Sequence, residues 1–252
     1  MQLKQQVRKF TRLINYEKVV KTTYDDVALA TSIIKNTLEY SAFLSKENSI
    51  PITSLRTALP FALGEVQHRI TVLDFGGGAG TTYFEAKHFF PNKDFRWIVL
   101  ETKLMANMAQ SLNSTTDELE FISDFSELQN TKIDFVIANS SLQYTDNPID
   151  YLTKLTNLKA KYLYITRMPL TNSGSIKVQQ ISRLGDNGPQ IDGKSVDASV
   201  ISIQATVVSR NEFEDTLARL YQVKHRILEE KGSFNGSGKV FDLFGFFCVI
   251  GV

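Results

Sequence analysis

The sequence predicts an α/β protein with a Rossmann-like, doubly wound sheet that is mostly parallel. Three observations support this fold class. Short apolar segments alternate with segments of helical periodicity between residues 71 and 166, which is the pattern of βαβ units. A glycine-rich loop follows the first of these apolar segments. The chain also ends in two β-rich stretches separated by glycines, which predicts an antiparallel C-terminal hairpin.

The N-terminal part, residues 1–68, has a helical and irregular pattern, and we expect it to form helices that cover the sheet domain. Residues Thr23–Asp26 resemble a capping signal, and apolar residues recur at helical spacing from Val27 to Leu38. Pro51 interrupts this pattern. A second short helix is expected over residues 55–63.

The middle of the chain predicts five strands, each followed by a turn or a helix. The strands are expected at residues 71–75, 96–101, 119–122, 133–139 and 161–166. The fourth is almost wholly apolar, as a strand buried on both faces should be. Helices are expected at residues 83–88, 103–112 and 147–158. Asn147 and Pro148 suit the N-cap and first position of the last of these helices.

The C-terminal part completes one domain over residues 69–252, with an insertion at about 171–208. Residues 171–195 are rich in Gly, Ser, Asn and Asp, which predicts a long loop. The sequence Ser209–Glu212 is a capping box and predicts a helix to about Leu220. The final strands are expected at 221–228 and 241–250, joined by the glycine-rich segment 231–239.

Composition excludes several functional classes. The 252 residues include 28 basic and 27 acidic residues, for a net charge of +1, so we expect no nucleic-acid partner. The single cysteine, Cys248, lies in an apolar run and is expected in the core. Three scattered histidines give no zinc signature. We expect a cytoplasmic protein without a membrane partner, because no signal peptide or run of about 20 apolar residues is visible. The oligomeric state stays open.

The strongest motif is the loop that follows the first strand, with the sequence VLDFGGGAG over Val72–Gly80. Glycines there allow a sharp turn and a close approach of a ligand. The loop lacks the Gly-Lys-Ser/Thr of a P-loop, and Thr81 stands where a dinucleotide fingerprint has its third glycine. An acid before the glycines instead suits S-adenosylmethionine, whose ammonium group and ribose need acceptors; a tight turn without a ligand is the alternative. The candidate cofactor-binding residues of this loop are Asp74, Gly76, Gly77, Gly78 and Gly80.

Polar residues at the ends of the next strands extend this candidate cofactor site. Glu101, 21 residues after Gly80, could accept both hydrogen bonds of a ribose diol, and Thr102 follows it. A surface carboxylate at a helix start is the alternative for Glu101. Asp124 and Phe125 could hold the amine and the face of adenine, or could be a turn aspartate and a core phenylalanine. The small polar residues Asn139 and Ser140 could face the methionine part.

With these motifs the sequence resembles class I S-adenosylmethionine-dependent methyltransferases, closely over about residues 71–166 and loosely over the terminal strands. The loop VLDFGGGAG, together with YDDVALAT at residues 24–31 and ITRMP at residues 165–169, is similar to a bacterial methyltransferase family. Members of that family are often linked with surface-polysaccharide biosynthesis. The resemblance implies methyl transfer to an oxygen or nitrogen of a small acceptor.

Candidate acceptor-binding residues are Tyr83, Tyr144 and Arg167. Arg167 ends the fifth strand and could clamp a phosphate or carboxylate, which favours an anionic acceptor such as a sugar, a sugar nucleotide or a phosphorylated glycan precursor. A structural ion pair is the alternative for Arg167, and core packing is the alternative for Tyr83. The N-terminal helices and the 171–195 loop are expected to border the acceptor pocket.

No catalytic base is assigned from the sequence. A sulfonium is already a good leaving group, so alignment of the two substrates can supply much of the catalysis. Two other functions stay open on the sequence alone. One is an NAD-dependent oxidoreductase on a related fold, and the other is a non-catalytic protein that keeps a cofactor pocket.

Overall fold

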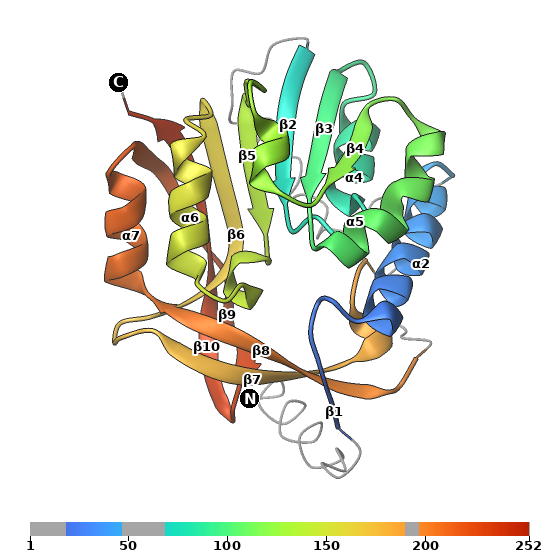
Figure 1. Ribbon diagram of the computed structural model, residues 1–252. Helices are drawn as coiled ribbons and strands as arrows, with labels where there is room; N and C mark the ends of the chain where they lie inside the picture. Colours follow the sequence, from blue (N-terminus) through green and yellow to red (C-terminus); the bar gives the residue numbers. More distant parts are fainter. Residues whose placement is uncertain (1–18, 47–68, 190–196, 252) are drawn as a thin grey trace.

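The computed structural model describes residues 19–46, 69–189 and 197–251. A central sheet carries helices on both faces, and a second group of strands crosses beneath its carboxyl edge (Figure 1). The sheet is mostly parallel and ends in an antiparallel C-terminal hairpin. This arrangement confirms the predicted fold class.

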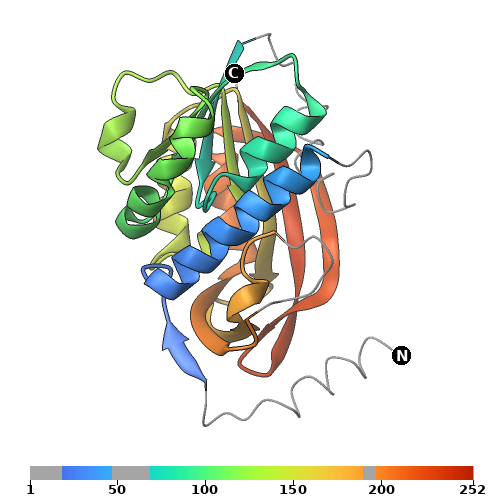
Figure 2. The ribbon, with the colours of Figure 1, turned by 90° about the vertical axis from the view of Figure 1, so that its right-hand side faces the viewer.

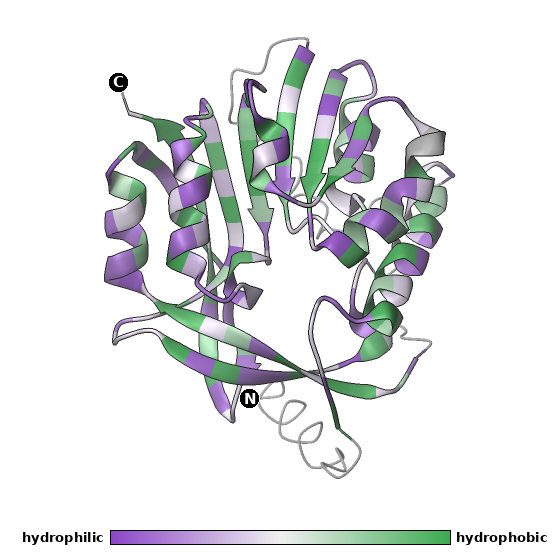
Figure 3. Ribbon diagram, viewed as in Figure 1, coloured by the Kyte–Doolittle hydropathy of each residue, from purple (hydrophilic) through white to green (hydrophobic). Residues whose placement is uncertain are grey.

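The five parallel strands of the central sheet lie in the order β6-β5-β2-β3-β4. Their bounds are Arg69–Phe75 for β2, Asp94–Leu100 for β3, Leu119–Ile122 for β4, Phe135–Asn139 for β5 and Tyr162–Thr171 for β6. All five predicted strands are therefore present, and β6 continues beyond its predicted end at residue 166. Hydrophobic colours gather on these strands in Figure 3, in keeping with burial on both faces.

Two hydrophobic clusters cover the two faces of the sheet. One cluster contains side chains of α2, α4 and α5, whose bounds are Val27–Leu44, Thr81–Phe89 and Lys103–Ala109. The other contains side chains of α6, Pro148–Asn157, and α7, Arg210–Ala218. The sheet is thus doubly wound, with the 3₁₀ turns η3, η4, η5 and η6 at Gln110–Thr115, Phe125–Leu128, Leu142–Tyr144 and Leu184–Asp186.

Helix starts are only partly as predicted. Helix α6 has Asn147 as its N-cap and Pro148 as its first residue, which confirms that prediction. The capping box at Ser209 is wrong, because the Ser209 side chain makes no capping hydrogen bond. The carboxylate of Glu212 accepts instead from Ser175 Oγ at 3.3 Å. Contact with the inserted strands therefore replaces the local cap.

The C-terminal hairpin consists of β9, Tyr221–Gly236, and β10, Lys239–Ile250. Strand β10 lies antiparallel between β6 and β9. The predicted connection at 231–239 is too long, because only Ser237 and Gly238 separate the strands, both with positive φ. Cys248 is buried and unpaired on β10.

The loop prediction for residues 171–195 is wrong, because this segment contains β7, Ile176–Arg183. It pairs antiparallel with β8, Val200–Ser209. Strand β8 also pairs with the end of β6 and with β1, Val20–Thr22. The physical reason is a third apolar cluster between this ribbon and the C-terminal hairpin, made by Val178, Ala205, Val207, Phe234 and Leu243.

Helix α2 begins at the predicted capping signal. The Asp26 carboxylate accepts from the backbone N–H groups of Ala28 and Leu29, at 2.9 and 3.1 Å. The buried face is shifted from the prediction, since Val27 and Leu38 are 60% and 43% exposed. Figure 2 shows α2 lying diagonally across one face of the molecule. The predicted break at Pro51 and the helix over 55–63 lie outside the described residues.

Candidate functional site

The glycine loop leaves β2 at the carboxyl edge of the sheet and leads into α4. Gly76 has a φ of +66°, a conformation that side chains disfavour. A Cβ at Gly76 would also lie 2.3 Å from the Cβ of Ser141. Ser141 Oγ donates to the carbonyl of Phe75 at 2.6 Å. The loop is therefore fixed against the end of β5, with no room for a side chain at Gly76.

The side chain of Asp74 lies directly beneath the glycine loop. Its side chain is fully buried, and a Cβ at Gly77 would lie 2.5 Å from its Cγ. Asp74 Oδ2 accepts from Trp97 Nε1 at 3.2 Å, whereas Oδ1 has no hydrogen-bond partner among the described residues. Burial raises the pKa of Asp74 to about 7, although the hydrogen bond from Trp97 acts in the opposite direction. The predicted acid thus lies beneath the glycines.

Glu101 joins the end of β3 to the glycine loop. Its Oε1 accepts from the Gly78 N–H at 2.9 Å, and its Oε2 accepts from the Thr102 N–H at 2.8 Å. Burial raises the pKa of Glu101, and these two backbone hydrogen bonds oppose the rise. Each carboxylate oxygen can accept a further hydrogen bond. Thr102 caps α5 by accepting from the Met105 N–H at 3.3 Å.

Asp124 and Phe125 have structural partners of their own. The exposed Asp124 caps η4, where it accepts from the Ser126 N–H at 2.7 Å, and this hydrogen bonding lowers the pKa of Asp124. The Phe125 ring packs against Phe75 and Tyr151, with centroids 6.2 and 6.3 Å apart. These positions agree with the turn and packing roles that were the alternatives for the pair.

Buried acceptor oxygens gather where β2 and β5 end. Asn139 Oδ1 and Gln143 Oε1 are both buried without a hydrogen-bond partner in the described chain, as is Asp74 Oδ1. Ser140, with a φ of +54°, accepts from Gln143 Nε2 at 2.9 Å. Buried polar groups are ordinarily hydrogen-bonded. These oxygens therefore fit a ligand that brings N–H donors, such as an ammonium group.

Arg167 and Tyr144 are the other two residues that the sequence predicts to bind the acceptor. Arg167 lies within β6 and not at its end, and Tyr144 lies in η5. Arg167 has a φ of +56°, and its backbone N–H donates to Glu229 Oε1 at 2.9 Å. Its side-chain Nε is buried without a hydrogen-bond partner among the described residues. The Tyr144 hydroxyl donates to Gln180 Oε1 at 2.5 Å. Burial raises the pKa of Tyr144 while the charge of Arg167 lowers it, so the two side chains influence each other.

The structure does not bring Tyr83 to this group. Tyr83 is 3% exposed and packs edge-on against Trp97, with centroids 5.9 Å apart. Its hydroxyl lies 2.9 Å from Glu118 Oε2 and 3.1 Å from Thr116 Oγ1. The core position that was the alternative for Tyr83 is the one observed, and Tyr83 is not carried forward as an acceptor-binding residue.

The sequence reasoning missed Tyr24 as a residue of this region. Its ring lies against that of Tyr144, with centroids 5.0 Å apart, and its carbonyl accepts from Thr102 Oγ1 at 3.5 Å. The segment around Tyr24 was interpreted only as a capping signal. Nothing in the local sequence indicates a contact with residues 102 and 144.

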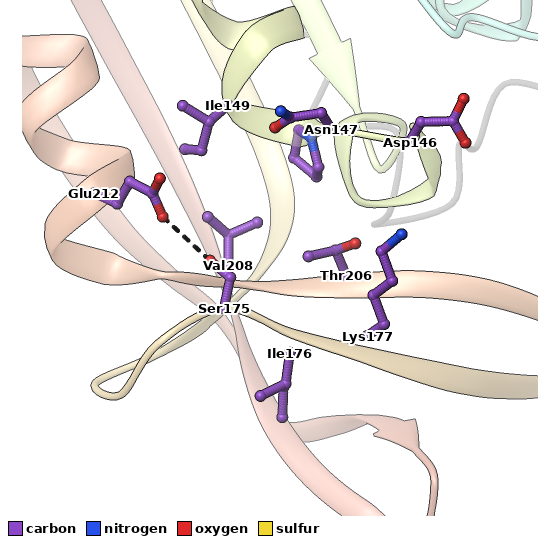
Figure 4. A pocket seen from close by; sticks show the side chains of 10 residues that line it. Asp146, Asn147, Ile149, Ser175, Ile176, Lys177, Thr206, Val208 and Glu212 are labelled. Carbon is purple, nitrogen blue, oxygen red and sulfur yellow. Dashed lines mark hydrogen bonds between the residues drawn. The ribbon is translucent and has the colours of Figure 1, made fainter.

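A separate pocket of about 210 Å³ lies between the first turn of α6 and the β7–β8 ribbon. Figure 4 shows its lining, with the hydrogen bond between Ser175 and Glu212 at one end. Asp146 and Lys177 contribute opposite charges to this lining, and Thr206 contributes a hydroxyl. None of the sequence-predicted site residues lines this pocket.

In the described part of the chain, no helix is long and apolar enough to span a membrane. The same residues contain no group of three or more His, Cys, Asp or Glu side chains that could hold a metal ion.

Comparison with known proteins identifies the fold. No family model matches the sequence, and no curated protein does. The CcbJ methyltransferase from Streptomyces caelestis matches with a TM-score of 0.52 and 11% identity, over 84% of this chain and 96% of that one. The [4+2]-cyclase SpnF matches with a TM-score of 0.53 and 10% identity, over 92% of this chain and 98% of that one. The chain therefore has the fold of the class I S-adenosylmethionine-dependent methyltransferases, on which proteins with different reactions are built.

Proposed function

We propose that this protein binds S-adenosylmethionine at the carboxyl edge of its sheet and catalyses methyl transfer to a small acceptor. The observation that carries the proposal is the contact between Glu101 and the glycine loop. The carboxylate that ends β3 accepts from the Gly78 N–H at 2.9 Å. This contact supports a single site, in which Glu101 would offer acceptors to a ribose diol beside a loop that a ligand can approach closely.

The surrounding residues fit the rest of this cofactor. The acceptor oxygens of Asn139 and Gln143, which have no hydrogen-bond partner in the described part of the chain, suit the ammonium group of its methionine part. Asp124 and Phe125 stand after β4, where the adenine would lie if the ribose is at Glu101. When bound, the cofactor supplies a methyl group on a sulfonium leaving group. The role of the chain is then to orient the acceptor atom for in-line attack and to exclude water.

The acceptor that we propose is small and anionic. Arg167 supports this, because its Nε is buried without a hydrogen-bond partner among the described residues and its positive charge lowers the pKa of Tyr144. A guanidinium in that position can form charge-assisted hydrogen bonds to a phosphate or carboxylate. A sugar nucleotide or a phosphorylated precursor of a bacterial surface glycan would provide such a group, and so would a sugar that carries a carboxylate. The glycan context rests on the sequence resemblance alone.

Calorimetric titration with S-adenosylmethionine, S-adenosylhomocysteine and NAD in parallel tests the proposal. We expect the first two to bind and NAD not to bind. Glu101→Ala should lose two hydrogen bonds, each contributing about 0.5–1.5 kcal/mol, so S-adenosylhomocysteine should bind roughly 5- to 150-fold more weakly. Glu120→Ala is the matched control, because it removes an exposed carboxylate of β4 that pairs with Arg96.

Each other outcome points to a different function. Binding of NAD without S-adenosylhomocysteine would contradict the proposal and favour an oxidoreductase. Binding of S-adenosylhomocysteine without turnover of any small anionic acceptor would favour a non-catalytic cofactor-binding protein. Equal weakening by Glu101→Ala and Glu120→Ala would remove Glu101 from the site.

A further inference from the structure

Tyr24 lies in a tight turn between β1 and α2. The Asp26 N–H donates to the Thr23 carbonyl at 3.2 Å, and the Asp25 N–H donates to Thr23 Oγ1 at 3.3 Å. Asp26 then caps α2. The backbone of this turn is therefore held on both sides of Tyr24, and its ring contacts the ring of Tyr144.

Tyr24 contacts residues from both parts of the proposed site, through its backbone on one side and its ring on the other. Thr102, next to Glu101, donates to the Tyr24 carbonyl at 3.5 Å, and the Tyr24 ring packs on Tyr144. Burial raises the pKa of Tyr24, Tyr144 and Glu101 raise it further, and Arg167 lowers it. The pKa of the phenol thus responds to the charge of Glu101, the proposed cofactor residue, and to that of Arg167, the proposed acceptor residue.

The element that carries Tyr24 is fastened to the rest of the molecule. Asn36 Nδ2 donates to the carbonyls of Gly185 and Asn187 at 3.1 and 2.7 Å. On the other side, the Tyr40 hydroxyl donates to Glu85 of α4 at 2.9 Å. Ile33 also packs over the loop, since a Cβ at Gly78 would lie 3.1 Å from its Cγ2. We call β1, α2 and η6 the cover, and it holds Tyr24 in place over the carboxyl edge.

The position of Tyr24 bears on how the proposed site would bind the positively charged sulfonium of the cofactor. If its ribose is at Glu101 and its methyl group points towards the acceptor near Arg167, its sulfonium lies between these two residues. Tyr24 contacts Thr102, which follows Glu101, and packs on Tyr144, so its ring is a candidate to face the sulfonium. An aromatic face attracts a cation, most strongly where water is excluded. The neutral thioether of S-adenosylhomocysteine gains nothing from this attraction.

We propose that the ring of Tyr24 recognises the positive charge of the sulfonium, so that the site binds S-adenosylmethionine in preference to S-adenosylhomocysteine. This inference rests on the proposed function. The cover would then also promote product release. Methyl transfer converts the charged sulfonium to a neutral thioether, so S-adenosylhomocysteine binds more weakly than S-adenosylmethionine. Tyr24 is then a residue that determines specificity for the charged cofactor.

The test measures the dissociation constants of both compounds by calorimetry for the wild-type protein, Tyr24→Leu and Tyr24→Phe. Tyr24→Leu should weaken binding of S-adenosylmethionine by about 2- to 30-fold more than binding of S-adenosylhomocysteine. Tyr24→Phe keeps the ring and should preserve the ratio of the two constants within about twofold. Tyr40→Phe is the matched control, because it loosens the cover without altering the ring at position 24.

A shape-conserving series guards against misfolding of the leucine variant. Mono-, di- and trifluorinated phenylalanine at position 24 keep the ring while weakening the negative charge on its face. We expect affinity for S-adenosylmethionine to fall stepwise along this series and affinity for S-adenosylhomocysteine to stay constant. A constant ratio of the two affinities throughout would overturn the inference. If the wild-type protein binds neither compound, the proposed function itself fails, which is a distinguishable result.

Discussion

The buried carboxyl group of Asp74, beneath the glycine loop, leads us to predict how the free energy of unfolding depends on pH. Asp74 is fully buried, and burial raises the pKa of its carboxyl from 3.8 to about 7. The folded protein therefore keeps a proton on Asp74 over a pH range in which the unfolded chain has released it. Asp74→Asn removes this ionisable group while keeping the shape of the side chain.

The sign and size of the effect follow from linkage. Because the pKa is higher in the folded state, Asp74 lowers the free energy of unfolding as the pH rises from about 4 to about 7, with no further change above that range. A difference of about three pKa units corresponds to ~4 kcal/mol. We therefore expect the free energy of unfolding of Asp74→Asn, relative to wild type, to increase by ~4 kcal/mol between about pH 4 and about pH 8.

Urea unfolding followed by circular dichroism across this pH range measures the difference directly. Glu120→Gln, which removes an exposed carboxylate, serves as the control for general charge effects. A difference between Asp74→Asn and wild type that stays constant with pH would refute the reasoning. A difference that decreases with pH would show that the folded state favours the ionised form of Asp74.

Three further predictions concern the loop, the cover and the acceptor side. In Gly76→Ala the new Cβ would clash with the Cβ of Ser141 at a position where φ is +66°. We therefore expect the free energy of unfolding to fall by about 1–3 kcal/mol and S-adenosylhomocysteine to bind more weakly. An unchanged melting temperature and affinity would contradict this. Asn36→Ala removes two hydrogen bonds between α2 and the η6 region and should lower the free energy of unfolding by about 1–3 kcal/mol in urea titrations; no change would show that these bonds do not fasten the cover. Arg167→Ala and Arg167→Lys should both raise the KM for an anionic acceptor, by roughly tenfold or more, whereas Lys177→Ala should leave it unchanged. The reverse pattern in steady-state kinetics would place the acceptor in the pocket of Figure 4.

Much of the central sheet is predictable because its signals are local. Strand β4 has its predicted bounds at Leu119–Ile122, and α6 starts where Asn147 and Pro148 indicate. The glycine loop is likewise predicted by its own residues, since the positive φ at Gly76 favours glycine. In each case the residues that determine the structure are neighbours in the sequence.

The β7–β8 ribbon was missed because its stability comes from distant partners. The glycine, serine and asparagine residues near its start suggested a loop. The apolar residues at positions 176 and 178 are too few to predict a strand by themselves. The stronger signal was in residues 200–209, which are rich in β-branched side chains. Pairing with β1 and packing on the C-terminal hairpin complete the ribbon.

The candidate site was only half predictable for the same reason. Glu101 could be placed near the loop, because parallel strands end at a common edge. The partners of the acceptor side could not be placed, since Tyr144 meets Tyr24 and Gln180 across long stretches of sequence. Tyr83 was predicted near the acceptor but lies in the core. Its position after the glycine loop does not tell which face of α4 its side chain occupies.

A crystal structure of the protein with bound S-adenosylhomocysteine tests the central claim most directly. We predict that the ribose hydroxyls lie within hydrogen-bond distance of the Glu101 carboxylate and that the ammonium group contacts Asn139 Oδ1, which has no partner in the described chain. We also predict that Glu101 keeps its hydrogen bond from the Gly78 N–H. A ligand in the pocket of Figure 4, or a Glu101 carboxylate still bound only by the backbone of the loop and Thr102, would contradict the account.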